Sequence, residues 1–447
     1  MKRILILGAG RSATDFIQYI FDQSAEHNWY ITLGDYNLPL AQSKIEDPER
    51  GKAIQFDVHD EARLEELIKE ADAVASFMPP PFHPPIAQLC LKHHAHMITA
   101  SYVSDEIKAL HEEAEAAGLL FLNEMGADPG LDHMSAMRTI DKIHAKGGTI
   151  ISFRSYAGAL VTARSNDNPW GYKFTWAPKN VICAGQGGAA RYIRDGQLRY
   201  IPYHRLFGIV DDVKVGGEYG TLEAYANRDS LPYRSKYGLE NIPTLIRGTL
   251  RVPGFCATWL ILVQIGLTED NYRIPHSNTL SYADWMRSYL PAKSHPDLRQ
   301  AVADFAGLTV DSPEIGRLEW AGLFSDDIIE CDNASPAEIL LDLFLKKWKF
   351  EEKDTDIFIL SDLFQYELDG KRYRYSSTLS AEGLDHQHTA ISRTVGLPAG
   401  IGLKLLLTGK LKRRGVRIPV TADLYEPILN ELSTLGISFE ESIEELD

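Results

Sequence analysis

Six short apolar runs, separated by segments with helical spacing, occupy the first 125 residues and constrain how this part of the chain can fold. The segment Glu61–Glu70 between two of the runs has apolar residues spaced as on one face of a helix. Strands that alternate with helices in this way form a parallel sheet wrapped by helices. We therefore predict a doubly wound, Rossmann-type α/β domain. The six runs are Ile4–Leu7, Tyr30–Leu33, Ala53–Val58, Ala73–Met78, Met97–Ala100 and Leu119–Leu122.

The first run leads directly into a glycine turn with the pattern G-x-G-x-x-A. Gly8 permits a tight turn, Gly10 lets the backbone approach a pyrophosphate, and the small Ala13 lets the following helix pack closely. Amides at a helix N-terminus face a bound anion, so Arg11 and Ser12 complete the predicted phosphate site. The pattern alone is a weak signal. After a first strand and ahead of five more, it favours a dinucleotide cofactor over a structural turn.

Asp35 follows the second run, where this fold places the acid that accepts the ribose hydroxyls of NAD. A carboxylate there repels a 2′-phosphate and no arginine follows directly, so the sequence favours NAD, with NADP as the second choice. The alternative is that Asp35 only caps the next helix. The pairs Asp57-Val58 and Phe77-Met78 end the third and fourth runs. We predict that they line the adenine and nicotinamide halves of the cofactor, or else that they are ordinary strand ends.

Length and composition narrow the remaining possibilities. A chain of 447 residues is too long for one ordinary core and predicts two or three domains. The net charge of −16 disfavours nucleic acid and anionic membranes as partners, and we find no apolar run near the roughly 18 residues of a membrane span. The four cysteines lack metal or redox spacing, and the histidines at 93–96 and 386–388 lack accompanying ligands. We therefore expect a reduced, cytoplasmic protein without a metal site.

Six longer strings resemble, in the same order, those of the glutamate-forming saccharopine dehydrogenases. The resemblance covers nearly the whole chain, and several strings are long enough to be specific. The strings are TASY at 99–102, GADPGLDHM at 126–134, NPWGYKFTW at 168–176, NRDS at 227–230, RGTLR at 247–251 and TVGLP at 394–398.

The resemblance implies an oxidoreductase that acts on a CH–NH donor in lysine metabolism. The implied reaction is NAD(P)-dependent oxidation of saccharopine, a secondary amine joining lysine to glutarate, to L-glutamate and 2-aminoadipate 6-semialdehyde, or the reverse reductive condensation. Ala157 stands where some relatives carry cysteine, so that cysteine is not required here. The implied substrate-site residues are Ser101, Tyr102, Asp128, Arg228, Arg247, Thr249 and Arg251.

The chemistry of the arginine-containing strings supports this substrate independently. Saccharopine carries three carboxylates, which planar guanidinium groups bind bidentately. If residues 247–251 form a strand, its period of two puts Arg247, Thr249 and Arg251 on one face and makes an anion-binding ledge. The alternative is a surface strand that happens to carry basic residues.

Proton transfers must accompany the hydrolysis of the oxidised substrate. The titratable candidates near the reacting carbon are Asp128, Tyr102 and His133, of which we predict Asp128 and Tyr102 as the catalytic pair. Alternatively, Asp128 holds the substrate ammonium group. For His133 the alternative is a purely structural place on the first turn of a helix predicted over 132–145.

We predict three ranges: a dinucleotide-binding domain over 1–125, a mixed α/β substrate domain over 126–390 with a mainly helical subdomain over 254–353, and a C-terminal segment over 391–447. The resemblance adds that this last segment returns to pack on the cofactor domain. The expected partners are small molecules, namely saccharopine, glutamate and the semialdehyde. A homodimer is one assembly that we consider, and the sequence leaves the oligomeric state and the physiological direction open.

Two other functions stay open at this stage. A polyamine enzyme similar to carboxynorspermidine dehydrogenase would reduce an imine formed from a diamine and an aldehyde, but its more cationic substrate fits the arginine-rich strings poorly. A non-catalytic NAD-binding regulator is the other, because a dinucleotide fold alone does not imply turnover.

Overall fold

The computed structural model describes residues 1–446 and divides into two compact units. Unit 1 combines Met1–Ile150 with the residues from Tyr366 onwards, and unit 2 is Ile151–Gln365. Residues 126–150 and 366–390 therefore belong to unit 1, so the compact units divide the chain at other points than the ranges expected from the sequence. The division into 1–125, 126–390 and 391–447 itself stays a prediction.

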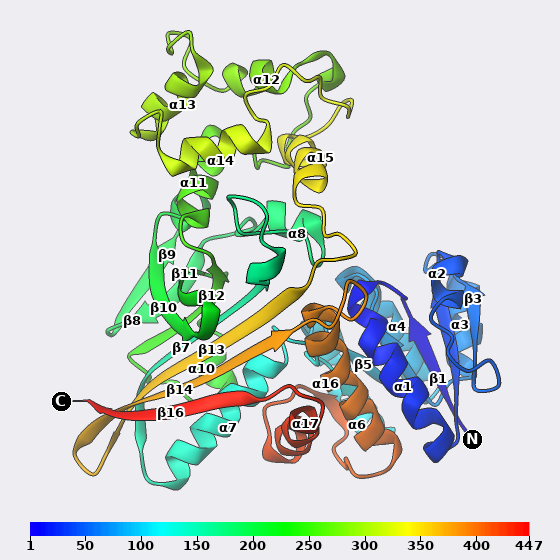
Figure 1. Ribbon diagram of the computed structural model, residues 1–447. Helices are drawn as coiled ribbons and strands as arrows, with labels where there is room; N and C mark the ends of the chain where they lie inside the picture. Colours follow the sequence, from blue (N-terminus) through cyan, green and yellow to red (C-terminus); the bar gives the residue numbers. More distant parts are fainter. Residues whose placement is uncertain (447) are drawn as a thin grey trace. The chain divides into compact units, whose positions relative to one another are not determined.

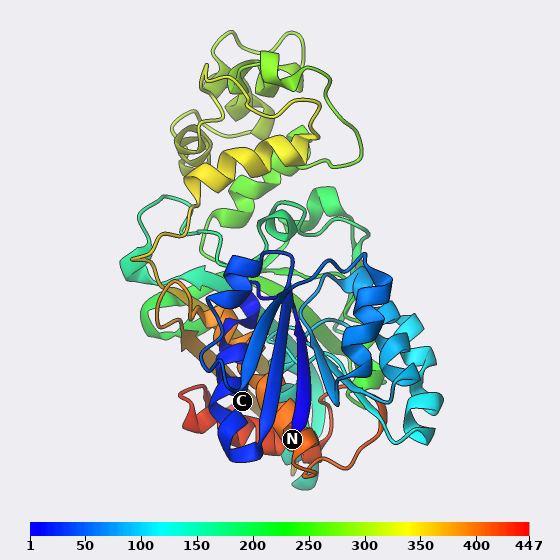
Figure 2. The ribbon, with the colours of Figure 1, turned by 90° about the vertical axis from the view of Figure 1, so that its right-hand side faces the viewer.

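Unit 1 contains a seven-stranded sheet in the order β15-β6-β5-β4-β1-β2-β3, and every neighbouring pair is parallel. This topology confirms the predicted doubly wound α/β fold. Figure 2 shows the blue strands of this sheet side by side. The strands are β1 (Lys2–Leu7), β2 (Trp29–Asp35), β3 (Gly51–Gln55), β4 (Ala73–Ser76), β5 (His96–Thr99), β6 (Leu120–Leu122) and β15 (Gly415–Arg417).

All six apolar runs form strands, because a parallel sheet covered by helices buries both faces of each strand. Residues 4–7 of β1, for example, are at most 2% exposed. Two strand ends were predicted too late. β3 ends before Asp57, whose carbonyl accepts a turn hydrogen bond from the amide of Asp60. β4 ends before Phe77, since Pro79 and the following prolines carry no N–H for a ladder.

The helices of unit 1 include the predicted helix over 132–145, which is α7. Asp60 starts α3 by accepting a hydrogen bond from the amide of Arg63. The helices are η1 (Arg11–Ala13), α1 (Thr14–His27), α2 (Leu38–Gln42), α3 (Glu61–Lys69), η2 (Pro80–Phe82), α4 (His83–Lys92), α5 (Asp105–Ala109), α6 (His111–Ala116), α7 (Leu131–Ala145), α16 (Ala390–Leu407) and α17 (Ala422–Thr434).

The C-terminal segment completes unit 1. β15 extends the parallel sheet beyond β6, and α16 packs along α1 (Figure 1). A Cβ on Gly396 would lie 2.5 Å from the backbone nitrogen of Phe16, and one on Gly400 would lie 2.7 Å from the ring of Tyr19. These two glycines stand one helical turn apart, so they give α16 a flat face against α1.

Helix α16 also corrects one expectation from the sequence. Its 18 residues are apolar enough, by length and composition, to cross a membrane, although we expected no such run. Within the structure 72% of this stretch is buried, and the helix lies against α1 and β5 of the same unit. This burial is the pattern of a core helix.

Unit 1 further contains an antiparallel pair that the sequence did not indicate, β14 (Lys371–Glu382) with β16 (Phe439–Leu446). Four of the eight residues of β16 are glutamates, and most of the strand is exposed. A charged, exposed strand has none of the apolar alternation from which strands are recognised.

Unit 2 contains a mixed sheet whose strands follow the order β10-β11-β12-β7-β13. Off this path, β8 pairs with β12, and β9 pairs with β8. β12 pairs parallel with β7 and antiparallel with β11. The strands are β7 (Thr149–Val161), β8 (Ala190–Arg194), β9 (Gln197–Ile201), β10 (Val210–Gly216), β11 (Gly220–Ala226), β12 (Thr244–Arg251) and β13 (Asp356–Leu368).

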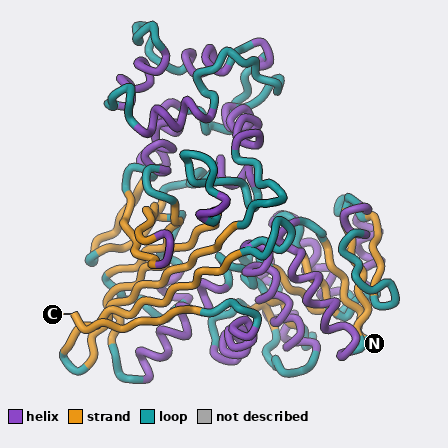
Figure 3. Tube along the Cα trace, viewed as in Figure 1, coloured by secondary structure: helices purple, strands orange, loops and turns teal. Residues whose placement is uncertain are grey.

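The segment from 254 to 353 is mainly helical, as expected, and is drawn in purple and teal in Figure 3. The helices of unit 2 are η3 (Ala163–Ser165), α8 (Pro178–Ile182), α9 (Tyr203–Leu206), η4 (Gly217–Tyr219), α10 (Tyr233–Lys236), α11 (Phe255–Ile265), η5 (Ser277–Thr279), α12 (Tyr282–Ser288), α13 (Leu298–Ala306), α14 (Pro313–Ala321) and α15 (Pro336–Lys347).

Aromatic side chains form the core beneath these helices. Trp348 stacks on Phe344 with ring centroids 3.9 Å apart, and Trp170 meets Trp348 edge-on at 5.3 Å. Trp170 and Tyr172 are fully buried. The family-like string at 168–176 therefore serves the core of unit 2, where each buried aromatic residue contributes a large apolar area.

The packing of α16 on α1 predicts the effect of Gly396→Ala. The new methyl group meets the backbone of Phe16, which cannot move as a side chain can, and such overpacking costs about 1–3 kcal/mol. The preference of alanine for helices offsets roughly 1 kcal/mol of this cost. We expect a net loss of up to about 2 kcal/mol in the free energy of unfolding, measured by denaturant titration.

Gly316→Ala is the matched control. Gly316 lies inside α14, where a Cβ would meet nothing within 4 Å, so this variant should unfold at the same or a higher denaturant concentration. An equal loss of stability in both variants would show that the contact with α1 is not the reason why Gly396→Ala destabilises the protein.

Candidate cofactor and substrate sites

The carboxyl ends of the parallel strands of unit 1 bring the predicted cofactor residues to one edge of the sheet. Leu7 of β1 pairs with Gly34 of β2 on one side and with Ser76 of β4 on the other. Gly8, Asp35 and Phe77, the next residues along these strands, therefore lie at one level. Ligands bind at this edge in open α/β sheets, where the strand order reverses between β1 and β4.

The glycine turn has the geometry that a pyrophosphate requires. Gly8 has a φ of +99°, and a Cβ there would lie 3.2 Å from the carbonyl oxygen of Phe77. A Cβ on Gly10 would meet nothing within 4 Å, so the space beside this residue is open to a ligand. Arg11 and Ser12 begin η1, and the first amides of a helix have no intrahelical acceptor. The fully buried Ala13 packs inward. These residues fit a dinucleotide.

Asp35 is tied to the glycine turn as well as to its own loop. Its Oδ2 accepts a hydrogen bond from the amide of Ala9 at 2.7 Å, and its Oδ1 accepts one from the amide of Asn37 at 2.8 Å. Asn37, rather than Asp35, caps α2, because its side chain accepts from the amide of Leu40. Each carboxylate oxygen has two lone pairs, so Asp35 can still accept a ribose hydroxyl.

The remaining predicted cofactor residues lie in loops beyond the strands. Phe77 packs on Phe16 of α1 with ring centroids 4.9 Å apart, and Met78 is half-buried after it. Asp57 is exposed, Val58 is half-buried, and the Asp57 carboxylate accepts a hydrogen bond from the amide of His59. Asp57 thus has a structural role in its own turn, and its contact with adenine stays a prediction.

Lys44 belongs to the same edge and was missed from the sequence. Its ammonium group donates to the hydroxyl of Thr14 at 2.6 Å and to the carbonyl of Gly10 at 3.3 Å. Burial lowers the pKa of Lys44 to about 8, even though the carboxylates of Asp15 and Asp35 favour its charged form. A lysine alone between α2 and β3 matches no motif, and only the fold places it beside the glycine turn.

The predicted catalytic pair is in contact. The Tyr102 hydroxyl donates to Oδ1 of Asp128 at 3.0 Å, with the Tyr102 side chain 41% exposed and Asp128 half-buried. Ser101 immediately precedes Tyr102 in the loop after β5. Ser101, Tyr102 and Asp128 therefore gather at the edge of the sheet that holds the cofactor residues.

The D-P-G turn that carries Asp128 is closed by its glycines. The amide of Gly126 donates to the carbonyl of Pro129 at 2.9 Å. A Cβ on Gly130 would lie 2.0 Å from the carbonyl oxygen of Gly126, so only glycine permits this closure. The closed turn fixes the backbone of Asp128 where the side chain meets Tyr102.

His133, the third titratable candidate, is fully buried against a carboxylate, and its role in proton transfer stays a prediction. Its Nε2 lies 2.6 Å from Oε2 of Glu124, and the two side chains are 0% and 1% exposed. The other carboxylate oxygen of Glu124 accepts from the amide of Val103, the residue after Tyr102. The pair joins the start of α7 to the loop of Ser101 and Tyr102, so it holds the site in shape and does not itself contact solvent.

The predicted substrate residues of unit 2 lie on or next to β12. Arg228 is exposed and takes a φ of +50° after β11, a conformation that is uncommon outside glycine. Arg247 is 6% exposed, and its guanidinium lies 4.0 Å from the ring centroid of Tyr233. The backbone amide of Asn227 donates a hydrogen bond to the backbone carbonyl of Arg247, which ties the string at 227–230 to the string at 247–251.

Arg251 differs from the ledge that the sequence suggested. It is 5% exposed, its guanidinium faces the rings of Tyr172, Tyr225 and Phe255, and one nitrogen donates to the carbonyl of Leu250. Thr249, half-buried, pairs across the strands with Tyr225. The strand alternation is as predicted, but aromatic side chains surround Arg251, so its contact with substrate stays a prediction.

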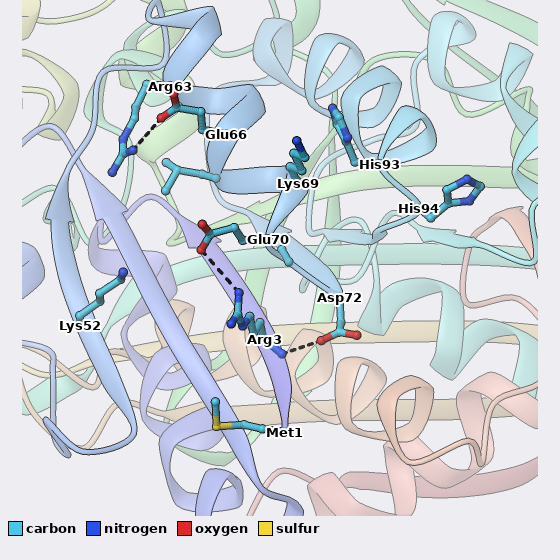
Figure 4. Close-up of a pocket in the computed structure, with 12 residues that line it drawn as sticks. Met1, Arg3, Lys52, Arg63, Glu66, Lys69, Glu70, Asp72, His93 and His94 are labelled. Carbon is cyan, nitrogen blue, oxygen red and sulfur yellow. Dashed lines mark hydrogen bonds and ion pairs between the residues drawn. The ribbon is translucent and has the colours of Figure 1, made fainter.

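A hollow at the opposite edge of the sheet of unit 1 is not part of this site. Figure 4 shows Arg3, Lys52, Glu70, Asp72 and other residues at its wall. These residues lie at the amino ends of β1, β3 and β4, whereas doubly wound folds bind cofactors at the carboxyl ends. Among residues 1–446, no group of three or more His, Cys, Asp or Glu side chains is placed to hold a metal ion.

Fold and glycine turn together define a nicotinamide-dinucleotide-binding protein, and comparison with known families agrees. The model of the saccharopine dehydrogenase NADP binding domain matches residues 4–122, and that of the saccharopine dehydrogenase C-terminal domain matches residues 126–437. The chain belongs to the saccharopine dehydrogenase family, which confirms the resemblance found in the sequence.

Individual relatives match over the full length. The chain is 32% identical to saccharopine dehydrogenase (NADP(+), L-glutamate-forming) of Schizosaccharomyces pombe and 31% identical to that of Saccharomyces cerevisiae, covering 99% and 96% of each pair of chains. It is 32% identical to alpha-aminoadipic semialdehyde synthase of Arabidopsis thaliana, covering 99% of this chain and 45% of that protein. Among solved structures, the apo saccharopine dehydrogenase (L-Glu forming) of Saccharomyces cerevisiae superposes with a TM-score of 0.89 at 30% identity, over 99% and 100% of the two chains.

The position of Lys44 predicts proton uptake when the cofactor binds. A pyrophosphate at the glycine turn stabilises the charged ammonium and raises its pKa above about 8. At about pH 8.5 the free protein therefore takes up a proton on binding, and its affinity for NADH falls as the pH rises further. Calorimetry in two buffers of different ionisation enthalpy measures the uptake.

Lys44→Arg is the control, because its guanidinium stays charged at this pH. It should keep the affinity but lose the uptake, and Lys44→Ala should lose both. If Lys44→Ala takes up as many protons as the wild type, the proton binds to another group.

Proposed function

We propose that this protein catalyses the NAD(P)-dependent oxidation of saccharopine to L-glutamate and 2-aminoadipate 6-semialdehyde, and the reverse condensation. The observation that carries the proposal is the contact between Tyr102 and Asp128 at the edge of the sheet that presents the glycine turn. Membership of the saccharopine dehydrogenase family supports it, as does full-length similarity to relatives named as glutamate-forming enzymes.

The bound nicotinamide supplies a hydride acceptor, and the residues of the chain position the substrate and move its protons. Loss of hydride from the carbon beside the secondary amine leaves an iminium, to which water must add before the carbon–nitrogen bond breaks. The Asp128 carboxylate can accept a proton from that water, while the Tyr102 hydroxyl donates a hydrogen bond to Oδ1 of the same carboxylate. Ser101 offers a hydroxyl to a substrate carboxylate, and Arg228 and Arg247 offer guanidinium groups to the others.

A direct assay tests the proposal. The purified protein should reduce NAD or NADP when saccharopine is added at alkaline pH, with glutamate and the semialdehyde formed in equal amounts. Carboxynorspermidine serves as the comparison substrate. Turnover of carboxynorspermidine alone would assign the protein to the polyamine enzymes, and binding of NADH without turnover of either substrate would make it a regulator.

We further propose NAD as the preferred cofactor. The NADP(+) in the names of the two yeast relatives and in the family model points the other way. Asp35, however, ends β2 with a carboxylate held beside the glycine turn by the amide of Ala9, and a 2′-phosphate there would meet its negative charge. Lys44 is close enough to interact with the Asp35 carboxylate and can offset part of this repulsion.

Substitution of Asp35 tests this preference. Asp35→Ala removes the charge that repels the 2′-phosphate and the acceptor for the ribose hydroxyls, each worth roughly 1–3 kcal/mol. We expect the ratio of kcat/KM for NAD to that for NADP to fall by about tenfold or more. Asp35→Asn separates the two effects, since it keeps a hydrogen-bond acceptor and loses only the charge. A wild-type protein that already uses NADP better than NAD would refute the assignment of Asp35.

Arg228 carries a second test, in unit 2. Arg228→Lys keeps the charge but loses the planar fork, so kcat/KM for saccharopine should fall by about 1.5–3 kcal/mol in free energy while NADH binding stays intact. Arg228→Ala should lose more, because the carboxylate then has no cation at all. Steady-state kinetics with saccharopine as the varied substrate measure both variants.

Arg199→Ala is the matched control for Arg228. Arg199 is an exposed arginine on β9 of the same unit and should be neutral in this assay. Unchanged kcat/KM in both Arg228 variants would remove Arg228 from the substrate site, and equal damage to NADH affinity would make its role structural.

A further inference from the structure

A buried histidine outside the residues assigned so far connects two strands of unit 1 to Ser101. His83 is the first residue of α4 and is 2% exposed. Its Nδ1 lies 3.0 Å from the hydroxyl of Ser76, the last residue of β4, and its Nε2 lies 2.8 Å from the hydroxyl of Ser101. Both ring nitrogens therefore face hydroxyl groups, one inside the sheet and one at the proposed substrate site.

The surroundings hold His83 in one place. Prolines flank it at 79–81, 84 and 85, and their fixed φ angles restrict the backbone on both sides. The hydroxyl of Thr99 on β5 lies 3.4 Å from Nε2 of His83. It also accepts a hydrogen bond from the backbone amide of Ser101 at 3.2 Å. Burial lowers the pKa of His83 to about 4, so the ring is neutral at working pH, with one nitrogen donating and the other accepting.

The hydroxyl of Ser76 decides which nitrogen carries the hydrogen. Ser76 is 0% exposed, and within residues 1–446 its hydroxyl has no hydrogen-bond partner other than His83. A buried hydroxyl that only accepts leaves its hydrogen unpaired, which is costly. The buried Thr99 hydroxyl makes the same demand on Nε2, but its contact is 3.4 Å long against 3.0 Å for Ser76 on Nδ1. Because hydrogen bonds weaken with distance, the Ser76 contact prevails: Ser76 donates to Nδ1, and the ring hydrogen resides on Nε2.

The orientation of Ser101 follows from this tautomer. With its hydrogen on Nε2, His83 donates to the Ser101 oxygen, and the Ser101 hydrogen is left to point elsewhere. The opposite tautomer would consume that hydrogen, because Ser101 would have to donate to Nε2. Only the first arrangement lets Ser101 donate to a carboxylate.

We propose that His83 is a positioning residue for saccharopine, which relays the direction of hydrogen bonding from Ser76 to Ser101 so that the Ser101 hydroxyl donates to a substrate carboxylate. This inference rests on the proposed function, which assigns Ser101 to the substrate. His83 itself touches neither substrate nor cofactor. It acts through Ser101, and its effect should therefore fall on substrate binding rather than on hydride transfer.

Kinetics of four variants test the relay. We expect His83→Leu to raise KM for saccharopine about tenfold, as loss of one hydrogen bond to a charged group does, with kcat within about twofold and NADH affinity unchanged. Ser101→Ala should raise KM to the same extent, and the double variant no further. His83→Gln, which can accept from Ser76 and donate to Ser101, should restore most of the loss. It also serves where His83→Leu folds poorly.

His96→Gln is the matched control. His96 belongs to the same sheet, burial also lowers its pKa to about 4, and its Nδ1 accepts the amide of Leu120 at the far end of the strands. This variant should leave KM for saccharopine unchanged. Additive effects of His83→Leu and Ser101→Ala, or an equal loss in His96→Gln, would overturn the relay.

Nitrogen NMR of histidine labelled in the ring reads the tautomer without any activity. The signal that disappears in His83→Gln belongs to His83, and it should show a hydrogen on Nε2 at neutral pH. A hydrogen on Nδ1 would overturn the inference even in an active enzyme. If the protein does not turn over saccharopine, the proposed function fails, while the tautomer still decides whether Ser76 sets the direction of the hydrogen bonds.

Discussion

Parallel pairing of β1 with both β2 and β4 is the constraint on which the candidate site depends. The register aligns Leu7 with Gly34 and with Ser76, and Ser76 in turn with Thr99. The chain therefore leaves four strands at the same edge, and residues far apart in sequence meet there without long loops to guide them. Because a slip of one residue would turn each buried side chain to the other face, the ladder fixes the site as firmly as it fixes the core.

The parallel sheet formed by the first 125 residues could be predicted because each strand is a continuous apolar run, as a sheet buried on both faces requires. The same property misplaced two strand ends. Val58 and Phe77 continue the apolar pattern, yet they belong to loops, and a run of hydrophobic residues does not tell a strand from a packed loop. β16 escaped notice for the opposite reason, since its exposed, charged residues carry no apolar pattern. β14 buries every second residue from Tyr375 to Ala381, but Ser377 among them interrupts the apolar pattern.

Motifs indicated the candidate site residues that act through the backbone or lie in a recognisable string, such as Gly8, Asp35 and the D-P-G turn. They could not identify residues whose role depends on a neighbour supplied by the fold. Lys44 and His83 carry no motif, although the prolines around His83 hint at a fixed backbone. For Arg251 the strand period places the side chain correctly but cannot reveal the rings of Tyr172 and Phe255 around it.

Helix α16 and strand β15 of unit 1 follow all of unit 2 in the chain. A ribosome that synthesises this protein releases β1 to β6 long before Gly396 and Gly400 can reach α1. The nascent cofactor-binding segment thus presents an uncovered apolar face of α1 while more than two hundred residues of unit 2 are still being translated. Cells must either shield that surface during synthesis or complete translation before it finds another partner.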